Sequence, residues 1–346
     1  MTELYTNLGN SGLKISRIIV GCMSFGKKSW MDWVIEDKEK VFAIMKKAYD
    51  SGIRTFDTAD VYSNGYSEIL LKEFMEKYQI KRDRIVILTK LFFPLGDSVP
   101  GQGQKSIFPD YELINSKGLS RKHIMDAAKD SIERLGTFAD VIQIHRFDPA
   151  TPIEETMEAL HDIVKLGYTR YIGASSMKCY QFVMMQNVAE KRGWTKFISM
   201  QNHYNLLFRS EEDEMNEYCN LTGVGIIPWS PNARGILTRP YNTNRDTSRF
   251  SSDPRLAMFV DTMGGGDIEV LNRVEKLAKD KGASMAAIAT AWILSKGCSP
   301  IIGFNKIERI DDALTALKTD LSIEDVKYLE ETYDYKNLST YGSNKK

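Results

Sequence analysis

Short apolar runs alternate with longer amphipathic segments from about residue 18 to residue 320 of the 346-residue chain. The runs are mostly β-branched or aliphatic, as expected for strands that are buried on both faces. The pattern predicts eight strands, at residues 18–21, 54–57, 85–89, 141–145, 171–174, 198–201, 225–228 and 300–303.

Helix boundaries are visible between several of these strands. Thr151 and Pro152 predict the N-cap and first residue of a helix that Gly167 ends. Later helices are predicted to begin after the N-caps Ser284 and Ser322. Near the C-terminus, a helix after the eighth strand has an apolar face that comprises Ile307, Ile310, Leu314 and Leu317.

Strand–helix alternation is compatible with an open doubly wound sheet or a closed barrel. Eight strands favour a (β/α)8 TIM barrel in a single domain, 1–346, and no GxGxxG motif of a Rossmann sheet follows the first strand. Residues 4–15, around Asn10-Ser11-Gly12, predict a β-hairpin that closes the barrel floor.

Two long segments interrupt the alternation, at residues 92–119 and 235–266, and the triplet Gly264-Gly265-Gly266 is predicted to lie in the second of these loops. Because both segments follow strands, we expect them on the C-terminal face, where barrel enzymes have their active sites.

Composition narrows the class of protein. Apolar residues make up 42% and charged residues 27%, and 46 basic residues balance 46 acidic ones, so neither nucleic acid nor an anionic membrane is an expected partner. Four widely spaced cysteines without a CxxC pair predict neither disulfides nor a zinc site, and no other metal site is expected. The N-terminus has no apolar signal region, so we expect a cytoplasmic protein. We also expect a monomer or weak homo-oligomer.

Four ionisable residues follow or end neighbouring predicted strands: Asp57, Tyr62, Lys90 and His145. Each has an ordinary structural interpretation alone, as a loop acceptor, a packing residue, a surface charge or a hydrogen-bonded core residue. Together they suit proton donation to a carbonyl oxygen. Asp57 would hold the Lys90 ammonium, and Lys90 would lower the pKa of Tyr62 from about 10 toward neutrality, which makes Tyr62 a better general acid. His145 would orient the carbonyl.

The chain resembles the aldo-keto reductases over nearly its whole length, and it is most similar to the aryl-alcohol dehydrogenase-like branch of fungi. The segments that carry the resemblance are FDTADVYSNGYSE (56–68), ILTK (87–90), GLSRKHIMDAAKDSIERLG (118–136), IQIHRFD (142–148), RYIGASSM (170–177), MQNHYNLL (200–207) and IPWSPNARGIL (227–237). The resemblance implies a TIM barrel, NADP(H) as cofactor, and a catalytic role for the four residues above.

The resemblance also implies cofactor contacts at matching positions. Ser175, Ser176 and Gln201 would hold the nicotinamide carboxamide, although many relatives have Ser-Asn in place of Ser175-Ser176. Trp229 would stack on the nicotinamide ring, where relatives more often have Tyr or Phe; the alternative is an ordinary buried aromatic. The remaining implied contacts are Ser230, Pro231, Asn232, Arg234 and Gly235 at the pyrophosphate, Gly21, Cys22 and Met23 at the nicotinamide ribose, and Asp57, Gly303, Phe304 and Asn305.

Lys306 and Arg309 lie near the N-terminus of the helix after the eighth strand, where the helix dipole disfavours cations. A bound anion would remove this conflict, and the resemblance implies the adenosine 2′-phosphate here. The alternative is a surface pair between Arg309 and Asp312, worth about 0.5 kcal/mol. Asp312 and Ala313 would border the adenine, although relatives often have Asn in place of Ala313.

Aromatic residues on the predicted C-terminal loops suggest the substrate pocket. Trp30, Trp33, Phe92, Phe93 and Phe108 would line its mouth beside Tyr62 and His145, which suits aryl or long aliphatic aldehydes, unless half of these rings only pack the loops. His123, His161 and His203 are interpreted as structural.

The sequence therefore predicts NADPH-dependent reduction of aldehydes or ketones. One alternative is an NADP(H)-binding sensor or accessory subunit with little turnover. Another is a barrel hydrolase, which would need a pair of acids across a cleft.

Overall fold

The structure is a computed structural model that describes residues 4–96, 111–245 and 248–336. Within these residues, eight parallel strands form one sheet in the order β10-β3-β4-β5-β6-β7-β8-β9. The strands are β3 (Ile19–Gly21), β4 (Thr55–Asp57), β5 (Val86–Leu91), β6 (Ala139–Ile144), β7 (Thr169–Ser175), β8 (Phe197–Gln201), β9 (Gly225–Ile226) and β10 (Ile301–Gly303). Each predicted strand overlaps one of these.

The two ends of the sheet meet. The backbone N–H groups of Ser299 and Ile301 donate to the carbonyls of Ile226 and Pro228, each at 3.0 Å. A parallel bridge between Trp229 and Ile301 continues the same pairing beyond β9. The predicted (β/α)8 barrel is confirmed.

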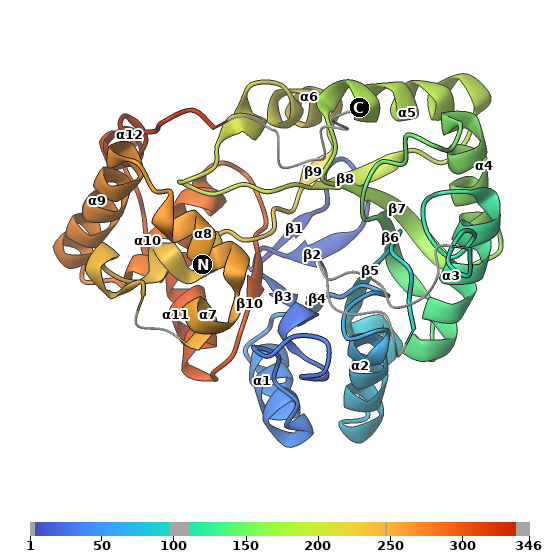
Figure 1. Cartoon of the computed structure of the whole chain (residues 1–346), viewed down its shortest axis with the longest axis horizontal. Helices are drawn as coiled ribbons and strands as arrows, with labels where there is room; N and C mark the ends of the chain where they lie inside the picture. The colour runs from blue at the N-terminus through green and yellow to red at the C-terminus, as the bar shows by residue number, and fades with distance from the viewer. Residues whose placement is uncertain (1–3, 97–110, 246–247, 337–346) are drawn as a thin grey trace.

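The main helices form a ring outside the strands (Figure 1). They are α1 (Lys38–Asp50), α2 (Tyr66–Lys77), α3 (Arg121–Leu135), α4 (Ile153–Lys165), α5 (Cys179–Arg192), α6 (Met215–Thr222), α9 (Gly265–Lys281), α10 (Met285–Ser295), α11 (Glu308–Ala316) and α12 (Ile323–Glu330). The predicted N-caps Ser284 and Ser322 are confirmed, because their hydroxyls accept from the N–H groups of Ala287 and Asp325. Among the described helices, none combines the length and hydrophobicity that a membrane-spanning segment requires.

The predicted hairpin is also confirmed and consists of β1 (Tyr5–Asn7) and β2 (Lys14–Ser16). Its turn lies against the start of β9, since Asn10 N donates to Gly223 O at 2.7 Å. Leu8 is buried in the same apolar cluster as the strand residues Ile19 and Leu88. The hairpin therefore covers the N-terminal end of the barrel and leaves the opposite end for a site.

Three predicted boundaries are wrong. Pro152 is the N-cap of α4, not its first residue, because its ψ of 136° is extended. Ile307 is 39% exposed and does not belong to the core face of α11, because it precedes the helix as its N-cap. The glycines 264–266 start α9 and do not lie in a loop, because the Asp267 carboxylate accepts from Gly264 N and caps the helix.

The predicted loop 235–266 is largely helical. It contains η5 (Tyr241–Thr243), α7 (Ser248–Ser252) and α8 (Pro254–Asp261), and η4 (Ala233–Thr238) leads into it. In the other long segment, 92–119, residues 97–110 and with them Phe108 lie outside the described residues. Both segments follow strands on the C-terminal face of the barrel.

Candidate active site

The four predicted catalytic residues meet at the C-terminal end of three adjacent strands. Asp57 ends β4, Lys90 lies near the end of β5, and His145 follows β6 directly. Tyr62 lies in the segment after β4. All four side chains belong to residues that are at most 7% exposed. Parallel pairing of β4 with β5 and of β5 with β6 therefore brings separate sequence positions into one buried cluster.

The Lys90 ammonium has an acceptor for each of its three protons. Nζ donates to Asp57 Oδ2 at 2.6 Å, to the Thr58 carbonyl at 2.8 Å and to Tyr62 Oη at 3.2 Å. Burial opposes the charge, but Asp57 and Tyr62 outweigh burial, and the pKa of Lys90 is raised above its usual value. The ammonium is therefore a fixed positive charge beside the tyrosine hydroxyl.

The second oxygen of Asp57 is held by two amides. Oδ1 accepts from Gln143 Nε2 at 3.1 Å and from Gln201 Nε2 at 2.8 Å, and Gln201 Nε2 also donates to Gln143 Oε1 at 3.1 Å. Gln143 was not among the residues predicted from the sequence. The signal was a polar residue between the apolar residues Ile142 and Ile144 of β6, which needs a partner when it is buried.

The predicted pKa of Tyr62 is wrong in direction. Burial raises the pKa of Tyr62 above its usual value, and the opposing effect of Lys90 is smaller. The phenol therefore keeps its proton at neutral pH. Lys90 donates to Oη, and no described residue accepts from the phenolic O–H, so the proton remains available to a ligand.

His145 is neutral in this cluster. Burial, with the cations of Arg146 and Lys90, lowers its pKa well below the usual value. Its ring lies edge-on to Tyr62 and to Phe93, with centroids 6.0 and 5.1 Å away, and its buried Nδ1 has no hydrogen-bond partner in the described part of the chain. A neutral imidazole can donate one N–H to an oxygen without carrying a charge.

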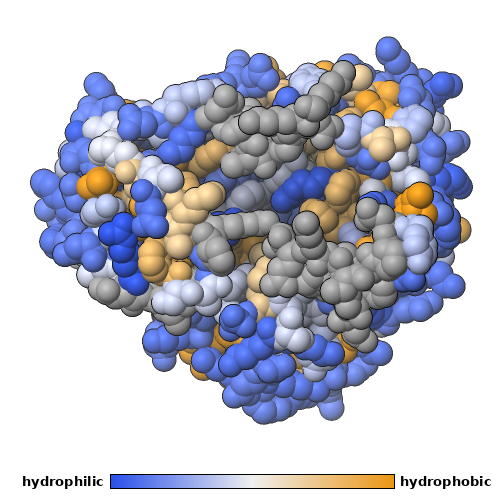
Figure 2. All heavy atoms as spheres, viewed as in Figure 1, coloured by the Kyte–Doolittle hydropathy of each residue, from blue (hydrophilic) through white to orange (hydrophobic). Residues whose placement is uncertain are grey.

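A cavity of about 1650 Å³ opens beside the cluster. Figure 2 shows this face hollowed near its centre, with hydrophilic and hydrophobic residues both bordering the hollow. Of the predicted residues, its lining includes Gly21, Met23, Trp33, Asp57, Tyr62, His145, Ser175, Gln201, Trp229, Ser230, Pro231, Asn232, Arg234, Gly235, Gly303, Phe304, Asn305, Lys306 and Arg309. The volume exceeds the range of roughly 300 to 1,000 Å³ for a single small-molecule pocket, so a cofactor and a substrate fit together.

Eight other predicted residues lie away from the lining. One is Lys90, which is buried and reaches the cavity only through its hydrogen bonds to Asp57 and Tyr62. Cys22 is buried, and Ser176 is buried and accepts a hydrogen bond from Trp229 Nε1 at 2.9 Å. Asp312 accepts from Ser284 Oγ, and the Arg309–Asp312 pair is not formed. The others are the buried Ala313, Trp30, which packs on Trp33 and Tyr62, the half-buried Phe92, which packs against the main core, and Phe93, which packs against His145.

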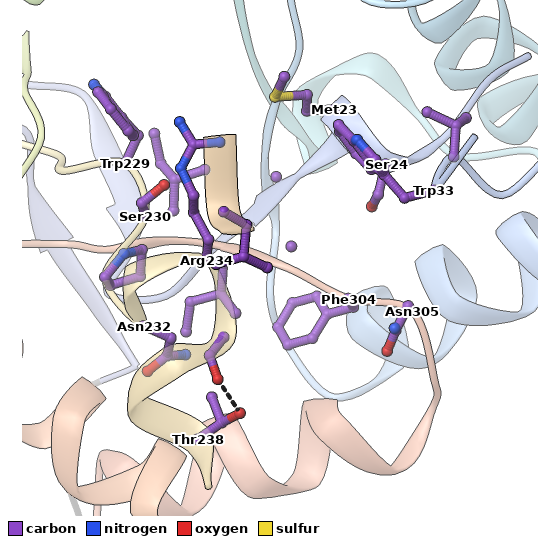
Figure 3. Close-up of a pocket in the computed structure, with 18 of the residues that line it drawn as sticks. Met23, Ser24, Trp33, Trp229, Ser230, Asn232, Arg234, Thr238, Phe304 and Asn305 are labelled. Atoms are coloured by element: carbon purple, nitrogen blue, oxygen red, sulfur yellow. Dashed lines mark hydrogen bonds between the residues drawn. The ribbon is translucent and has the colours of Figure 1, made fainter. Parts of the chain in front are cut away.

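The turn after β9 has an unusual backbone. Ser230, Ala233 and Arg234 have φ values of 54°, 46° and 58°, and Gly235 follows at 101°. Left-handed residues next to right-handed ones can point successive N–H groups into one concavity that binds anions. Figure 3 shows Trp229, Ser230, Asn232 and Arg234 on one wall of the cavity, with Met23, Ser24 and Trp33 on the opposite side.

Cations line another part of the cavity. Lys306 and Arg309 form no ion pair with any described residue, and Arg239 also lines the cavity. Burial and the charge of Arg309 lower the pKa of Arg239, so these two guanidinium groups are close enough to repel each other. Arg239 was not predicted from the sequence, in which it is distant from Lys306 and Arg309. Uncompensated cations around a cavity suit an anionic ligand.

Within the described part of the chain, no group of three His, Cys, Asp or Glu residues could hold a metal ion.

Comparison with known proteins identifies the family. The model of the aldo/keto reductase family matches residues 17–334. A Schizosaccharomyces pombe protein named putative aryl-alcohol dehydrogenase is 57% identical over 338 residues, which is 96% of each chain. A Saccharomyces cerevisiae protein of the same designation is 51% identical over 94% of this chain and 96% of its own. Versiconal hemiacetal acetate reductase of Aspergillus parasiticus is 46% identical over 95% of this chain and 96% of its own. The chain belongs to the aldo/keto reductase family.

Proposed function

We propose that this protein reduces aldehydes or ketones to alcohols with NADPH, and that Tyr62 is the general acid. The family places the chain among oxidoreductases that act on small carbonyl compounds. The observation that carries the proposal is the hydrogen bond of 3.2 Å from Lys90 Nζ to Tyr62 Oη, in a buried cluster at the cavity wall.

The bound cofactor supplies the hydride, and the protein must stabilise the negative charge that develops on the carbonyl oxygen. Tyr62 donates its phenolic proton to that oxygen. The Lys90 ammonium, held by Asp57, stabilises the phenolate that Tyr62 becomes. Neutral His145 donates a ring N–H to the same oxygen and orients the carbonyl.

The residues around the cavity fit a dinucleotide. Ser24 Oγ and Asn232 Oδ1 are buried at the cavity and have no hydrogen-bond partner among the residues that the structure describes, which suits polar groups of a ligand. The turn at residues 230–235 would hold the pyrophosphate. Lys306, Arg309 and Arg239 would hold a further phosphate, which supports NADPH over NADH because only NADPH has a 2′-phosphate.

The substrate side of the cavity is apolar and aromatic. Met23 and Trp33 line it, and Trp30 packs behind Trp33 with ring centroids 6.2 Å apart. Such walls suit aromatic or aliphatic aldehydes better than sugars. The names of the two yeast relatives, which specify aryl alcohols, agree with this substrate class.

The test is NADPH oxidation with a panel of aromatic and aliphatic aldehydes and ketones. Tyr62→Phe should lower kcat by about 10²- to 10⁴-fold, the usual contribution of a general acid. Tyr66→Phe, which removes a hydroxyl outside the cluster, is the matched control and should retain activity. Undiminished turnover in Tyr62→Phe would exclude Tyr62 as the acid. Tight NADPH binding without turnover of any carbonyl compound would favour a sensor or accessory subunit.

A further inference from the structure

Three aromatic rings are stacked along one wall of the cavity. His203 lies between Phe208 and Trp229, with ring centroids 4.4 Å and 4.1 Å away and interplanar angles of 19° and 6°. Phe208 is 3% exposed, whereas His203 and Trp229 are half-buried, and all three line the cavity. The imidazole therefore covers one face of the indole with a nearly parallel ring.

Hydrogen bonds fix the ends of this stack. Trp229 Nε1 donates to Ser176 Oγ at 2.9 Å, and Trp229 N donates to the Asn202 carbonyl at 2.9 Å. Asn205 Nδ2 lies 3.2 Å from His203 Nε2 and donates to the Ser230 carbonyl at 3.0 Å. The indole is thus held at its edge by Ser176 and on one face by His203, and the opposite face remains for a ligand ring.

The imidazole in the stack is uncharged. Burial, with the cations of Arg234 and Lys336, lowers the pKa of His203 to about 3. At neutral pH the ring therefore packs on Trp229 as a neutral aromatic and adds no positive charge behind it.

We propose that His203 is a positioning residue for the nicotinamide ring, because it sets the plane of the Trp229 indole on which that ring stacks. This inference rests on the proposed function, which places NADPH in the cavity. Loss of the imidazole would leave the Trp229 indole held only at its edge by Ser176, so its plane could tilt and ligand binding would then have to order it. The effect should be confined to the nicotinamide half of the cofactor, because the adenosine half would lie at Lys306 and Arg309.

Calorimetric titration with two ligands tests whether the effect is limited to the nicotinamide half. NADPH occupies both halves of the site, whereas adenosine 2′,5′-bisphosphate has no nicotinamide. His203→Ala should weaken NADPH about two- to tenfold, the usual range for one aromatic pair, and should leave the affinity for the bisphosphate unchanged. His203→Phe, which keeps a ring in the stack, should restore NADPH binding.

A double-mutant cycle identifies the residue through which His203 acts. In a Trp229→Ala background, His203→Ala should cause no further loss of NADPH affinity. A further loss of the full two- to tenfold, or an equal loss for both ligands, would overturn the positioning role while leaving the cofactor site intact. If the wild-type protein bound neither ligand, the proposed cofactor site would be refuted, and the role of His203 with it.

Discussion

Lys90 Nζ lies 2.6 Å from Asp57 Oδ2, and both side chains are at most 3% exposed. Removing one member of a buried pair leaves the other charge without its partner, which costs about 3–5 kcal/mol. The remaining partners are unequal: Asp57 would keep two amide donors, from Gln143 and Gln201, whereas Lys90 would keep one carbonyl and one hydroxyl acceptor.

We therefore expect Asp57→Asn to destabilise the protein more than Lys90→Met. The double variant should lose less free energy of unfolding than the two single variants lose together, because no unpaired charge remains in it. Urea unfolding measures all three free energies of unfolding. Lys46→Met, which breaks an exposed pair with Asp50, is the control and should change stability by no more than about 1 kcal/mol. If the losses in free energy of unfolding of the two single variants added up to the loss in the double variant, the two charges would not be coupled.

The pH dependence of catalysis should follow the raised pKa of Tyr62. Carbonyl reduction needs the phenol, so its kcat should be flat from about pH 6 to 9 and fall only above the usual tyrosine value of about 10. Alcohol oxidation needs the phenolate, so its kcat should rise with pH over the same alkaline range. The Lys90 cation lowers the pKa of Tyr62, so Lys90→Met should move both alkaline limbs to higher pH. If kcat of the wild-type enzyme instead changed with a midpoint near pH 7, the pKa of Tyr62 would not be raised.

Selectivity between NADPH and NADH should depend on the cationic part of the cavity. Substituting Lys306, Arg309 or Arg239 singly by Ala should weaken NADPH by about 10- to 100-fold, as expected for a hydrogen bond between charged groups. Affinity for NADH should change little, since it has no 2′-phosphate, and the preference for NADPH should fall with added salt. Lys318→Ala, an exposed charge outside the cavity lining, is the control. Equal losses for the two cofactors would refute the phosphate site.

The sequence was sufficient for the barrel, because strands buried on both faces leave uniform apolar runs. It was also sufficient for the convergence of Asp57, Tyr62, Lys90 and His145, because each lies near the C-terminal end of a strand or soon after it, in one parallel sheet. Properties that depend on the balance of burial and charge were not predictable. The sign of the pKa shift of Tyr62 depends on how completely the barrel withdraws it from water.

Contacts between residues that are far apart in the sequence were also not predictable. Gln143 and Gln201, from β6 and β8, both donate to Asp57 at the end of β4, and Arg239 is close to Arg309 although the two are far apart in the sequence. His203 was interpreted as structural, and its stack with Trp229 depends on the parallel bridge that the two residues form beyond β8 and β9. No local pattern in the sequence specifies these contacts.

The depressed pKa of His203 makes stability depend on pH. An unfolded histidine takes up a proton near pH 6.5, but the folded one does so only near pH 3, so the unfolded state binds more protons between these values. The contribution of neutral His203 to the free energy of unfolding is therefore fully present above about pH 6.5. It is lost as the pH falls, at up to about 1.4 kcal/mol per pH unit. His203→Phe should consequently show a shallower loss of stability between pH 7 and 5, measured as the urea midpoint. Phe208→Leu, which keeps the imidazole, should lower the midpoint at every pH without a shallower slope. Identical slopes for the wild type and His203→Phe would show that His203 is protonated equally in the folded and unfolded states.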